Sequence, residues 1–508
     1  MVRNMKCLVF LAFSFLVCNV LQSAPKREFR GAWIHIVNNN VIRTMNTDQV
    51  QKMFIEALDS IQSAGCNAVI FQVRPAADAF YQSSIEPWSR YLTGVQGKAP
   101  VPFWDPLQFI IEQAHSRGLE VHAWCNPYRV TLLESDTLAP GHIYFKNPGI
   151  FVKYGKQLYF NPAEPASRAY TVKVIADIVN RYDIEAIHFD DYFYPYPIAG
   201  ERFNDDAAFK KYAAAQGFKT TYPGLKPSDK DYDKIVKGDW RRYNVELLIK
   251  ELNDTIKSIK PWVRFGISPF GIHRNKKDTP DGSGSNTNGL SNYDELFADV
   301  PGWVAKGYID YYVPQLYWEI GHARADYKTL IEWWNKHHVK GQLYIGQSIS
   351  TLKKQMKRKI DLSRNLKHVS GNVWWPGFSL VSNTLKITDS LRLKFQKTPA
   401  LIPAYTELDR TAPAPPVEVV KNGRLIEWKQ EKAQADDPLQ KALFYAVYCF
   451  PKGAKKDMEN SKYLLKLTDK CSFNVIEENP HHAAGSRYVV TVIDRCWNES
   501  APGKMLWY

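Results

Sequence analysis

The chain has 508 residues and a formal net charge of +14, with 45% hydrophobic and 23% charged side chains. This length exceeds one ordinary core and predicts two or three domains, and the composition is typical of a soluble globular protein. The basic balance favours a polyanionic partner: nucleic acid, a membrane surface or an anionic wall polymer. The Lys and Arg residues are scattered, however, and no zinc spacing, RNA-binding signature or basic zipper is present, so we expect no nucleic-acid partner.

The first 24 residues predict an export signal. Basic residues precede the apolar run 7–21, and the small residue Ala24 closes it. The run is short for a membrane span and no comparable run follows, so we expect export to the periplasm or cell surface of a bacterium without a transmembrane span. Cys18 raises a lipid anchor as the alternative, although Val17 fits poorly the residue that precedes a lipidated cysteine.

Five cysteines remain after the export signal, an odd and sparse set that is no disulfide framework. Cys66 and Cys125 begin or end apolar runs and are expected as buried hydrophobic residues. Any bridge would involve Cys449, Cys471 and Cys496, and the sequence does not indicate which pair.

Short apolar runs alternate with helix-period segments from Phe29 onward. Eight such alternations within 27–397 predict a (β/α)₈ TIM barrel. A doubly wound open sheet is the alternative, but no glycine-rich phosphate turn follows the first run. The expected strands lie within 29–37, 67–75, 119–129, 184–195, 263–271, 308–319, 342–350 and 371–381.

The extra length of the barrel falls after its strands, in segments 75–104, 130–165, 196–240 and 272–291. In barrels these connections build the active-site face. Polar side chains gather at the same end of the strands, which packing alone explains poorly. They are Arg74, Asn126, Arg129, Asp190, Asp191, His273, Gln315 and Glu319.

The composition changes to Pro and Ala around 408–420, and 398–411 is expected as a linker. Residues 412–508 read as short alternating strands with turn residues between them, which predicts a small all-β sandwich of the immunoglobulin/fibronectin III kind. The closing segment "YVVTVIDRCWNESAPG" resembles the last strands of fibronectin type III domains. It carries no catalytic residues, so we expect a role in spacing or docking.

The doublet Asp190–Asp191 in "HFDDYFYP" can be a helix cap, a metal site, part of a binding-only barrel or a pair of catalytic acids. No helix follows it, and no HxH or HExxH motif supplies metal ligands, so we expect no metal and no cofactor. Glycoside hydrolysis needs two carboxyl groups in different environments. We expect Asp190 to stay ionised and Glu319 to be the general acid/base, with Asp191 tuning the pair or replacing Glu319 as the acid.

Aromatic side chains at the strand ends suit a sugar polymer, because aromatic faces bury C–H surfaces while their edges form hydrogen bonds. Arg74 and Arg129 would suit a carboxylate on the substrate, or would form internal salt bridges instead. The expected substrate-binding residues are Trp33, Arg74, Trp124, Asn126, Tyr128, Arg129, His188, Tyr192, His273, Gln315, Tyr317, Trp318 and Trp374.

Six segments in this order resemble the glycosyl-hydrolase-like family 10, which includes bacterial division-associated hydrolases of denuded peptidoglycan strands. They are "REFRGAWIHIV", "FQVRPAADAFYQSSIEPWSRYLTG", "HAWCNPYR", "HFDDYFYP", "FGISPFGIHRN" and "YVPQLYWE". The resemblance implies a TIM barrel and glycan hydrolysis in the envelope. We expect an endo-acting glycosidase of N-acetylhexosamine strands. The alternatives are a hydrolase of another extracellular polysaccharide and a non-catalytic carbohydrate-binding barrel, and the oligomeric state is not indicated.

Overall fold

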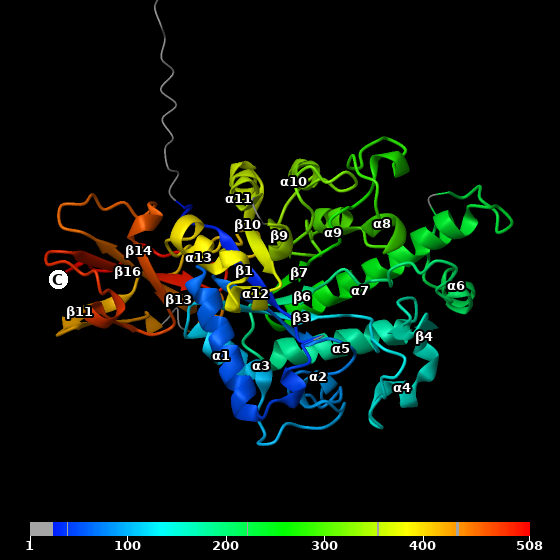
Figure 1. Ribbon diagram of the computed structural model, residues 1–508, viewed down its shortest axis with the longest axis horizontal. Coiled ribbons are helices and arrows are strands. Elements are labelled where there is room, and N and C mark those ends of the chain that lie inside the picture. The colour runs from blue at the N-terminus through cyan, green and yellow to red at the C-terminus, as the bar shows by residue number, and fades with distance from the viewer. Residues whose placement is uncertain (1–23, 38, 221, 353–354, 433–435) are drawn as a thin grey trace, which may run out of the picture.

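A computed structural model describes residues 24–508, apart from 38, 221, 353–354 and 433–435 (Figure 1). Residues 1–23 of the expected export signal, including Cys18, lie outside the described residues. Among the residues that are described, no helix has the length and apolar character needed to cross a membrane.

Eight parallel strands form a closed barrel in the order β1-β10-β9-β8-β7-β6-β3-β2. Seven of the strands lie within runs expected from the sequence, and β10 begins two residues before its expected run, so the predicted TIM barrel is confirmed and the open sheet is excluded. The strands are β1 (Phe29–Ile34), β2 (Ala68–Arg74), β3 (Glu120–Cys125), β6 (Ala186–Phe189), β7 (Arg264–Ile267), β8 (Tyr311–Tyr312), β9 (Gln342–Ser348) and β10 (Val369–Trp375).

Helices follow the barrel strands and cover the outside of the barrel (Figure 1). Several begin at the residues that favour helix starts: Asn46 caps α1 with a capping box, and Asp105 caps α3 ahead of a proline. The main helices are α1 (Thr47–Ser63), α3 (Pro106–His115), α5 (Pro165–Arg181), α7 (Gly238–Ile259), α9 (Val300–Lys306), α10 (Tyr327–Lys336) and α11 (Met356–Asn365), with α12 (Phe378–Val381) and α13 (Ile387–Ser390) after β10.

Strand β6 illustrates how alternation sorts side chains between the two faces of the barrel wall. Ile187 and Phe189 belong to the apolar layer between strands and helices. Ala186 belongs to the barrel interior, and His188 also points inward, where it bonds to Trp33. The same alternation directs Asp190, the next residue of this set, toward the mouth of the barrel.

The connections after the strands carry most of the additional elements, on the side of the barrel that is to the right in Figure 1. Among them is a two-stranded hairpin after β3, which overlies the barrel mouth. The elements are α2 (Arg90–Thr93), α4 (Ile143–Lys146), β4 (Phe151–Tyr154), β5 (Gln157–Phe160), α6 (Asp206–Tyr212) and α8 (Asn292–Glu295).

Residues beyond 412 form two antiparallel sheets, of orders β11-β12-β15 and β14-β13-β16-β17. Apolar side chains from both sheets, including Trp428, Val447 and Phe473, share a core, as expected of a sandwich. The closer likeness to fibronectin type III remains a prediction. The strands are β11 (Val417–Asn422), β12 (Leu425–Lys429), β13 (Ala442–Phe450), β14 (Leu464–Thr468), β15 (Ser472–Asn474), β16 (Arg487–Asp494) and β17 (Leu506–Trp507).

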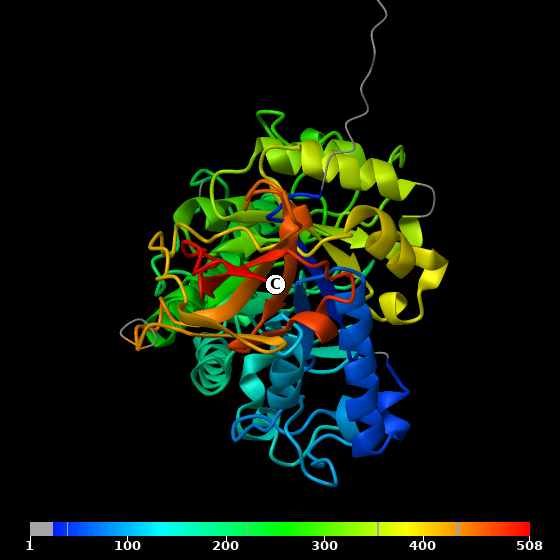
Figure 2. The ribbon, with the colours of Figure 1, turned by 90° about the vertical axis from the view of Figure 1, so that its left-hand side faces the viewer.

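This C-terminal module, residues 412–508, covers the end of the barrel opposite the long connections (Figure 2). Its strand β13 is apolar on both faces: Tyr445 and Val447 face the partner sheet, whereas Phe444 and Tyr448 join the core of the barrel interior. The segment 398–411, expected as a linker, is itself packed, with Leu401, Ile402 and Tyr405 buried in that core. Barrel and module therefore share apolar contacts.

The five cysteines of the described chain are all free thiols. Cys66 and Cys125 are buried, as expected for small hydrophobic residues. Cys449, Cys471 and Cys496, the expected candidates for a bridge, are not paired with one another.

Candidate active site

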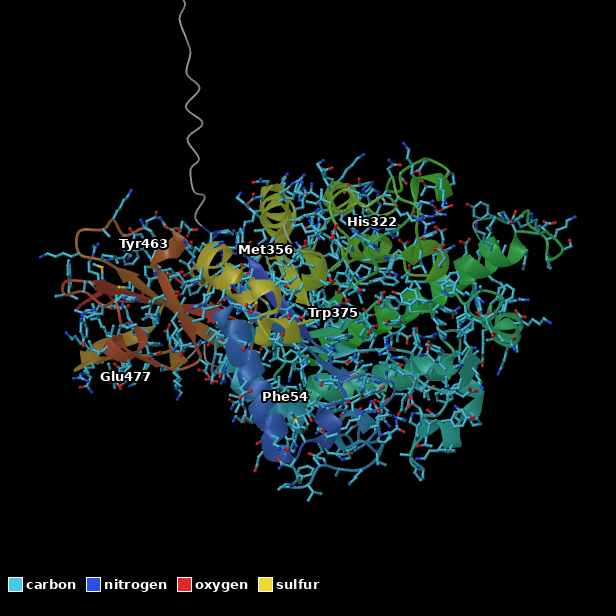
Figure 3. The ribbon with its side chains drawn as sticks, viewed as in Figure 1. Phe54, His322, Met356, Trp375, Tyr463 and Glu477 are labelled. Atoms are coloured by element: carbon cyan, nitrogen blue, oxygen red, sulfur yellow. The ribbon has the colours of Figure 1, made fainter. Side chains whose placement is uncertain are left out.

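Asp190 and Asp191 directly follow β6 and lie at the mouth of the barrel, only 4% and 2% exposed. Asp190 lines a cleft of about 490 Å³ whose walls come from the strands β2, β3 and β10 and from the connections after β1, β3 and β6. Trp375, labelled in Figure 3, forms part of this wall. The other lining residues are His35, Val37, Gln72, Trp124, Arg129, Leu132, Tyr154, Gln157, Tyr159, Tyr192, Pro195, Tyr196 and Ile198.

The carboxylate of Asp190 is held by two side chains of β3 and its end. Trp124 donates its indole N–H to Oδ2 at 3.0 Å, and Asn126 donates its amide to both oxygens at 3.0 and 3.2 Å. Burial raises the pKa of Asp190, while Arg129 and these two donors act in the opposite direction. Fixed donors to a buried carboxylate favour its ionised form.

Asp191 has a different environment. Its carboxylate accepts a hydrogen bond from the Tyr196 hydroxyl, within the tyrosine-rich segment that follows the doublet. Burial, followed by the negative charge of Asp190, raises the pKa of Asp191 to about 7. The two neighbouring carboxyl groups therefore have different environments, and such a difference lets one site hold an acid and a base at neutral pH.

The chain beyond β8 brings two further polar side chains to Asp191. Gln315 pairs with Phe270 and Gly346 in the barrel wall, and its side-chain hydrogen bond stabilises the charged form of Asp191. Burial, and then the charge of Asp191, raises the pKa of the Tyr317 hydroxyl, which places that hydroxyl beside the doublet. Both residues lie near the doublet, but neither lines the cleft, so their contact with substrate stays a prediction.

Arg129 and Tyr192 meet on one side of the cleft. The guanidinium lies 5.0 Å from the centre of the Tyr192 ring and donates from Nε and Nη2 to the carbonyl oxygen of Pro75. Its charge also acts on Asp190. An arginine fixed in this way supplies positive charge at the wall of the cleft.

Arg74 and Tyr128, both expected to contact substrate, lie away from the cleft. Arg74 is fully buried in a bidentate ion pair with Glu86, at 2.6 and 2.9 Å, and it donates to the carbonyl oxygen of Asn126 at 2.5 Å. Tyr128 is 1% exposed within the apolar layer outside the barrel wall. Arg74 thus supports the residue that holds Asp190, and it does not line the cleft.

The aromatic residues of β10 are offset by one position from the expectation. Trp374 is 1% exposed and belongs to the layer under the helices, whereas Trp375 faces the cleft and contacts His35 and Trp124. Successive strand residues point to opposite faces, so only one of the two tryptophans can reach the mouth. Trp375 takes the place that was expected for Trp374.

Trp318 and His273 also lie apart from the doublet. Trp318 packs against Phe270 at a ring distance of 5.4 Å, on the side of the barrel where His322 lies. His273 stacks on Trp333 at 5.4 Å and lines a different hollow of about 440 Å³. Neither is among the residues that line the cleft.

Glu319 begins the turn that leads to α10, where its carbonyl oxygen accepts from the backbone N–H groups of His322 and Tyr327. Burial lowers the pKa of Lys359 on α11 to about 8, and the negative charge of Glu319 partly opposes this shift. Glu319 is not among the residues that line the cleft. The carboxyl group of Asp191 adjoins Asp190 in the chain, and the charge of Asp190 acts on it directly.

Several residues of the cleft were not predicted from the sequence. His35 follows β1, and its Nδ1 is buried without a hydrogen-bond partner among the described residues. Gln157 and Tyr159 come from the β4–β5 hairpin, and Tyr196 from the segment after the doublet. Tyr196 could have been found from the alternating tyrosines of "YFYPYP", but the hairpin carries no such signal.

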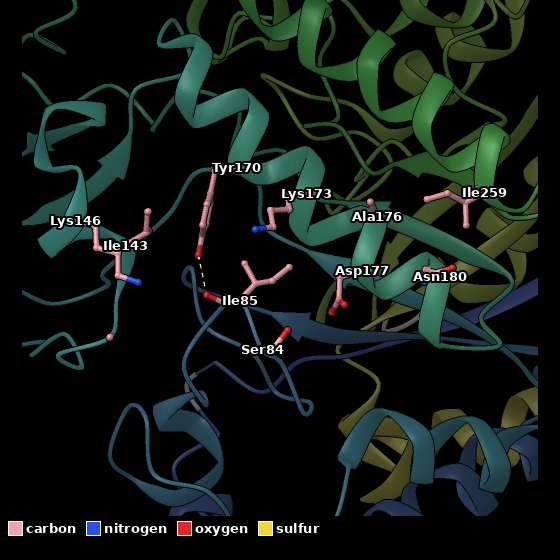
Figure 4. A pocket seen from close by; sticks show the side chains of 11 residues that line it. Ser84, Ile85, Ile143, Lys146, Tyr170, Lys173, Ala176, Asp177, Asn180 and Ile259 are labelled. Atoms are coloured by element: carbon pink, nitrogen blue, oxygen red, sulfur yellow. Dashed lines mark hydrogen bonds between the residues drawn. The ribbon is translucent and has the colours of Figure 1, made fainter.

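A separate hollow of about 680 Å³ lies between α5 and the connection after β2 (Figure 4). Tyr170 closes one side of it by donating to the carbonyl oxygen of Ile85 at 3.4 Å. Asp190 and Asp191 do not line it. Within the described part of the chain, no three His, Cys, Asp or Glu side chains group as metal ligands.

Comparison with known proteins agrees with this architecture. The protein is similar to the glycosyl hydrolase YngK of Bacillus subtilis, at 38% identity over 99% of this chain and 98% of that one, and to the glycosyl hydrolase DigH of Escherichia coli, at 34% identity over 68% and 82%. The PgaB (BpsB) glycoside hydrolase domain from Bordetella bronchiseptica shares the fold, with a TM-score of 0.50, 13% identity and coverage of 72% and 99%. The family model Glycosyl hydrolase-like 10 matches residues 28–363. The chain therefore belongs to the glycosyl hydrolase-like 10 family.

Proposed function

We propose that the protein is an exported glycosidase that cleaves glycan strands of the N-acetylhexosamine type, such as those of peptidoglycan, within the chain. One observation carries this proposal: two adjacent buried carboxyl groups at the barrel mouth, of which Asp190 lines the cleft, have different environments, Asp190 with two fixed donors and Asp191 with a pKa of about 7. Glycoside hydrolysis needs one carboxyl group that stays ionised and one that gives a proton.

Each carboxyl group has a separate role in this mechanism. Asp191 donates its proton to the leaving oxygen and recovers one from water, because its pKa is matched to neutral pH. Asp190 stays ionised and stabilises the positive charge that develops at the anomeric carbon. On an N-acetyl sugar the substrate's own acetamido oxygen can attack that carbon, and Asp190 then orients the acetamido group.

The walls of the cleft suit a sugar polymer. Trp124 and Trp375 pack edge to face at 6.1 Å, and their rings offer apolar surface for sugar C–H groups. Arg129 supplies positive charge for a carboxylate such as a lactyl group. The relatives named glycosyl hydrolases support the same class of reaction.

The test is incubation of the purified protein with amidase-stripped wall glycan, followed by measurement of new reducing ends. We expect reducing ends with the wild-type chain, and a loss of about 10²–10⁴ in rate for Asp191→Asn. The Asp190→Asn variant should lose most turnover while it still binds glycan. Binding without any reducing ends in the wild type would favour the other candidate, a carbohydrate-binding barrel, and chitin-like or other polysaccharides would then be compared as ligands.

A further inference from the structure

A continuous chain of buried hydrogen bonds runs along the barrel axis, from the C-terminal module to the floor of the cleft. We call it the axial chain. None of its side chains is more than 2% exposed, so no water competes for these bonds. Its members are Trp497, Glu120, His122, Tyr311, His188 and Trp33.

The direction of every bond in the upper half follows from the chemistry of Trp33. An indole nitrogen can only donate, so the Trp33 N–H, 3.2 Å from Nε2 of His188, requires that nitrogen to accept. The Ser268 hydroxyl, 3.1 Å from the same nitrogen, can donate to it or to the carbonyl oxygen of Phe189. Burial lowers the pKa of His188 well below its usual value, so the ring is neutral and carries its proton on Nδ1. That proton goes to the hydroxyl oxygen of Tyr311 at 2.9 Å.

The lower half continues in the same direction. Having accepted from His188, Tyr311 donates its own proton to Nδ1 of His122 at 2.7 Å. His122 must then carry its proton on Nε2, which donates to Glu120 at 3.1 Å. Burial raises the pKa of Glu120, but the charge of Arg264 and the His122 bond outweigh it and bring that pKa to about 2.

The C-terminal module closes the chain at its charged end. The indole N–H of Trp497 donates to Oε1 of Glu120, which also accepts from Arg264 at 2.5 Å. Trp497 has a φ of 65°, a left-handed conformation that a bulky residue rarely adopts. Arg495, two residues earlier, pairs with Asp183 at 3.0 Å on the same end of the barrel.

The upper end of the chain lies directly under the site. Trp33 contacts the ring of Tyr317 edge to face at 6.5 Å, and Tyr317 lies beside Asp191. His188 is two residues before Asp190 on the same face of β6. Space for the chain depends on Gly266, where a Cβ atom would lie 1.9 Å from Cζ of Tyr311.

We infer that Trp497 of the C-terminal module is a positioning residue for the active site, acting through the axial chain on His188 and Trp33. The inference rests on the proposed function for its effect on rate, but the bonding pattern itself can be measured without a substrate. The module is then a working part of the barrel, and a substitution at its Trp497 changes the site from the opposite end of the molecule.

The test uses the full chain with three variants. Trp497→Phe and Tyr311→Phe each keep a ring and remove one link. Trp428→Phe is the matched control, because Trp428 is buried in the same module but its Nε1 has no partner among the described residues. Histidine ¹⁵N spectra report the tautomers of His122 and His188, and steady-state kinetics on glycan separate kcat from KM.

We expect the wild-type spectrum to show His188 protonated on Nδ1 and His122 on Nε2. Tyr311→Phe should shift the ¹⁵N signals of both His188 and His122, and Trp497→Phe mainly those of His122. In each of these two variants we expect kcat to fall by about threefold to thirtyfold at unchanged KM. Trp428→Phe should change neither the spectra nor kcat. His188 protonated on Nε2, or a Trp497→Phe variant with wild-type spectra, would overturn the inference. If the wild-type protein cleaves no glycan, the proposed function fails. The spectra still test the hydrogen-bonding pattern of the axial chain in that case.

Discussion

Trp124 donates its indole N–H to Asp190 at 3.0 Å, which couples the third barrel strand to the carboxylate at the end of the fourth. The Trp124→Phe variant keeps the ring and removes this donor. A hydrogen bond to a charged group contributes about 1.5–3 kcal/mol, so we expect kcat to fall by about tenfold to a hundredfold. Trp104→Phe is the control, because Trp104 is equally exposed, at 8%, and lies outside the cleft. Equal kcat values for both variants would contradict the role of Trp124.

The activity should depend on pH through both aspartates. A general acid must be protonated, so the rate should fall as the pH rises through about 7, the pKa of Asp191. Asp190 must be ionised, so the rate should also fall on the acid side, at a pH above the usual aspartate pKa because burial raises it. The measurement is kcat/KM from pH 4 to 9. A rate that stays constant from pH 6 to 9 would exclude Asp191 as the acid.

Glu319 was expected to be the general acid, and the comparison of Glu319→Gln with Asp191→Asn decides between the two. The charge of Glu319 acts on Lys359, and Glu319 does not line the cleft that Asp190 lines. We therefore expect Glu319→Gln to keep more than about a tenth of the wild-type kcat, and Asp191→Asn to lose about 10²–10⁴. The reverse order would assign the general acid to Glu319. Glu332→Gln, a change on the exposed face of α10, serves as the control.

Sequence periodicity was sufficient for the barrel because each of its eight strands is an apolar run between helix-period segments. The same reasoning predicted that Asp190, Asn126 and Gln315 would meet, since the carboxyl ends of parallel strands converge on one face. The three residues do lie together: Asn126 donates a hydrogen bond to Asp190, and Gln315 forms a side-chain hydrogen bond with Asp191, the neighbour of Asp190.

The wrong predictions for Trp374 and Arg74 have local physical causes. Trp374 and Trp375 are adjacent, and a shift of one residue moves a strand side chain to the other face. Arg74 lies at a strand end, where the sequence suggests that it is available for substrate. Its partner Glu86 comes from the loop that follows, and strand periodicity does not predict where a loop residue lies. The docking of the C-terminal module had one visible sign: β13 reads "ALFYAVYCF", apolar at every position, as a strand buried on both faces requires.

The ion pair of Arg74 and Glu86 should matter more for stability than for substrate binding. Both side chains are 0% exposed, so Arg74→Met leaves a buried carboxylate without its partner. We expect a loss of about 3–5 kcal/mol in the free energy of unfolding, measured by urea titration. Arg74→Lys should recover only part of this, because a lysine cannot replace the bidentate geometry. Lys250→Met, which breaks an exposed pair with Asp254, should leave the unfolding curve unchanged. A raised KM with normal stability would instead support substrate contact.

Removal of residues 412–508 should destabilise the barrel itself. The truncated protein would expose Leu401, Ile402 and Tyr405, which are buried in the core that the barrel shares with the module, and would leave Glu120 without the Trp497 donor. Exposed apolar surface of this kind promotes aggregation. We expect the intact protein to melt in one cooperative transition, and the truncated protein to bind ANS and melt at a lower temperature without cooperativity, as measured by calorimetry. A truncated chain that keeps the wild-type melting temperature and binds no ANS would show that the two parts are independent, because a shared core cannot lose one half without cost to the other.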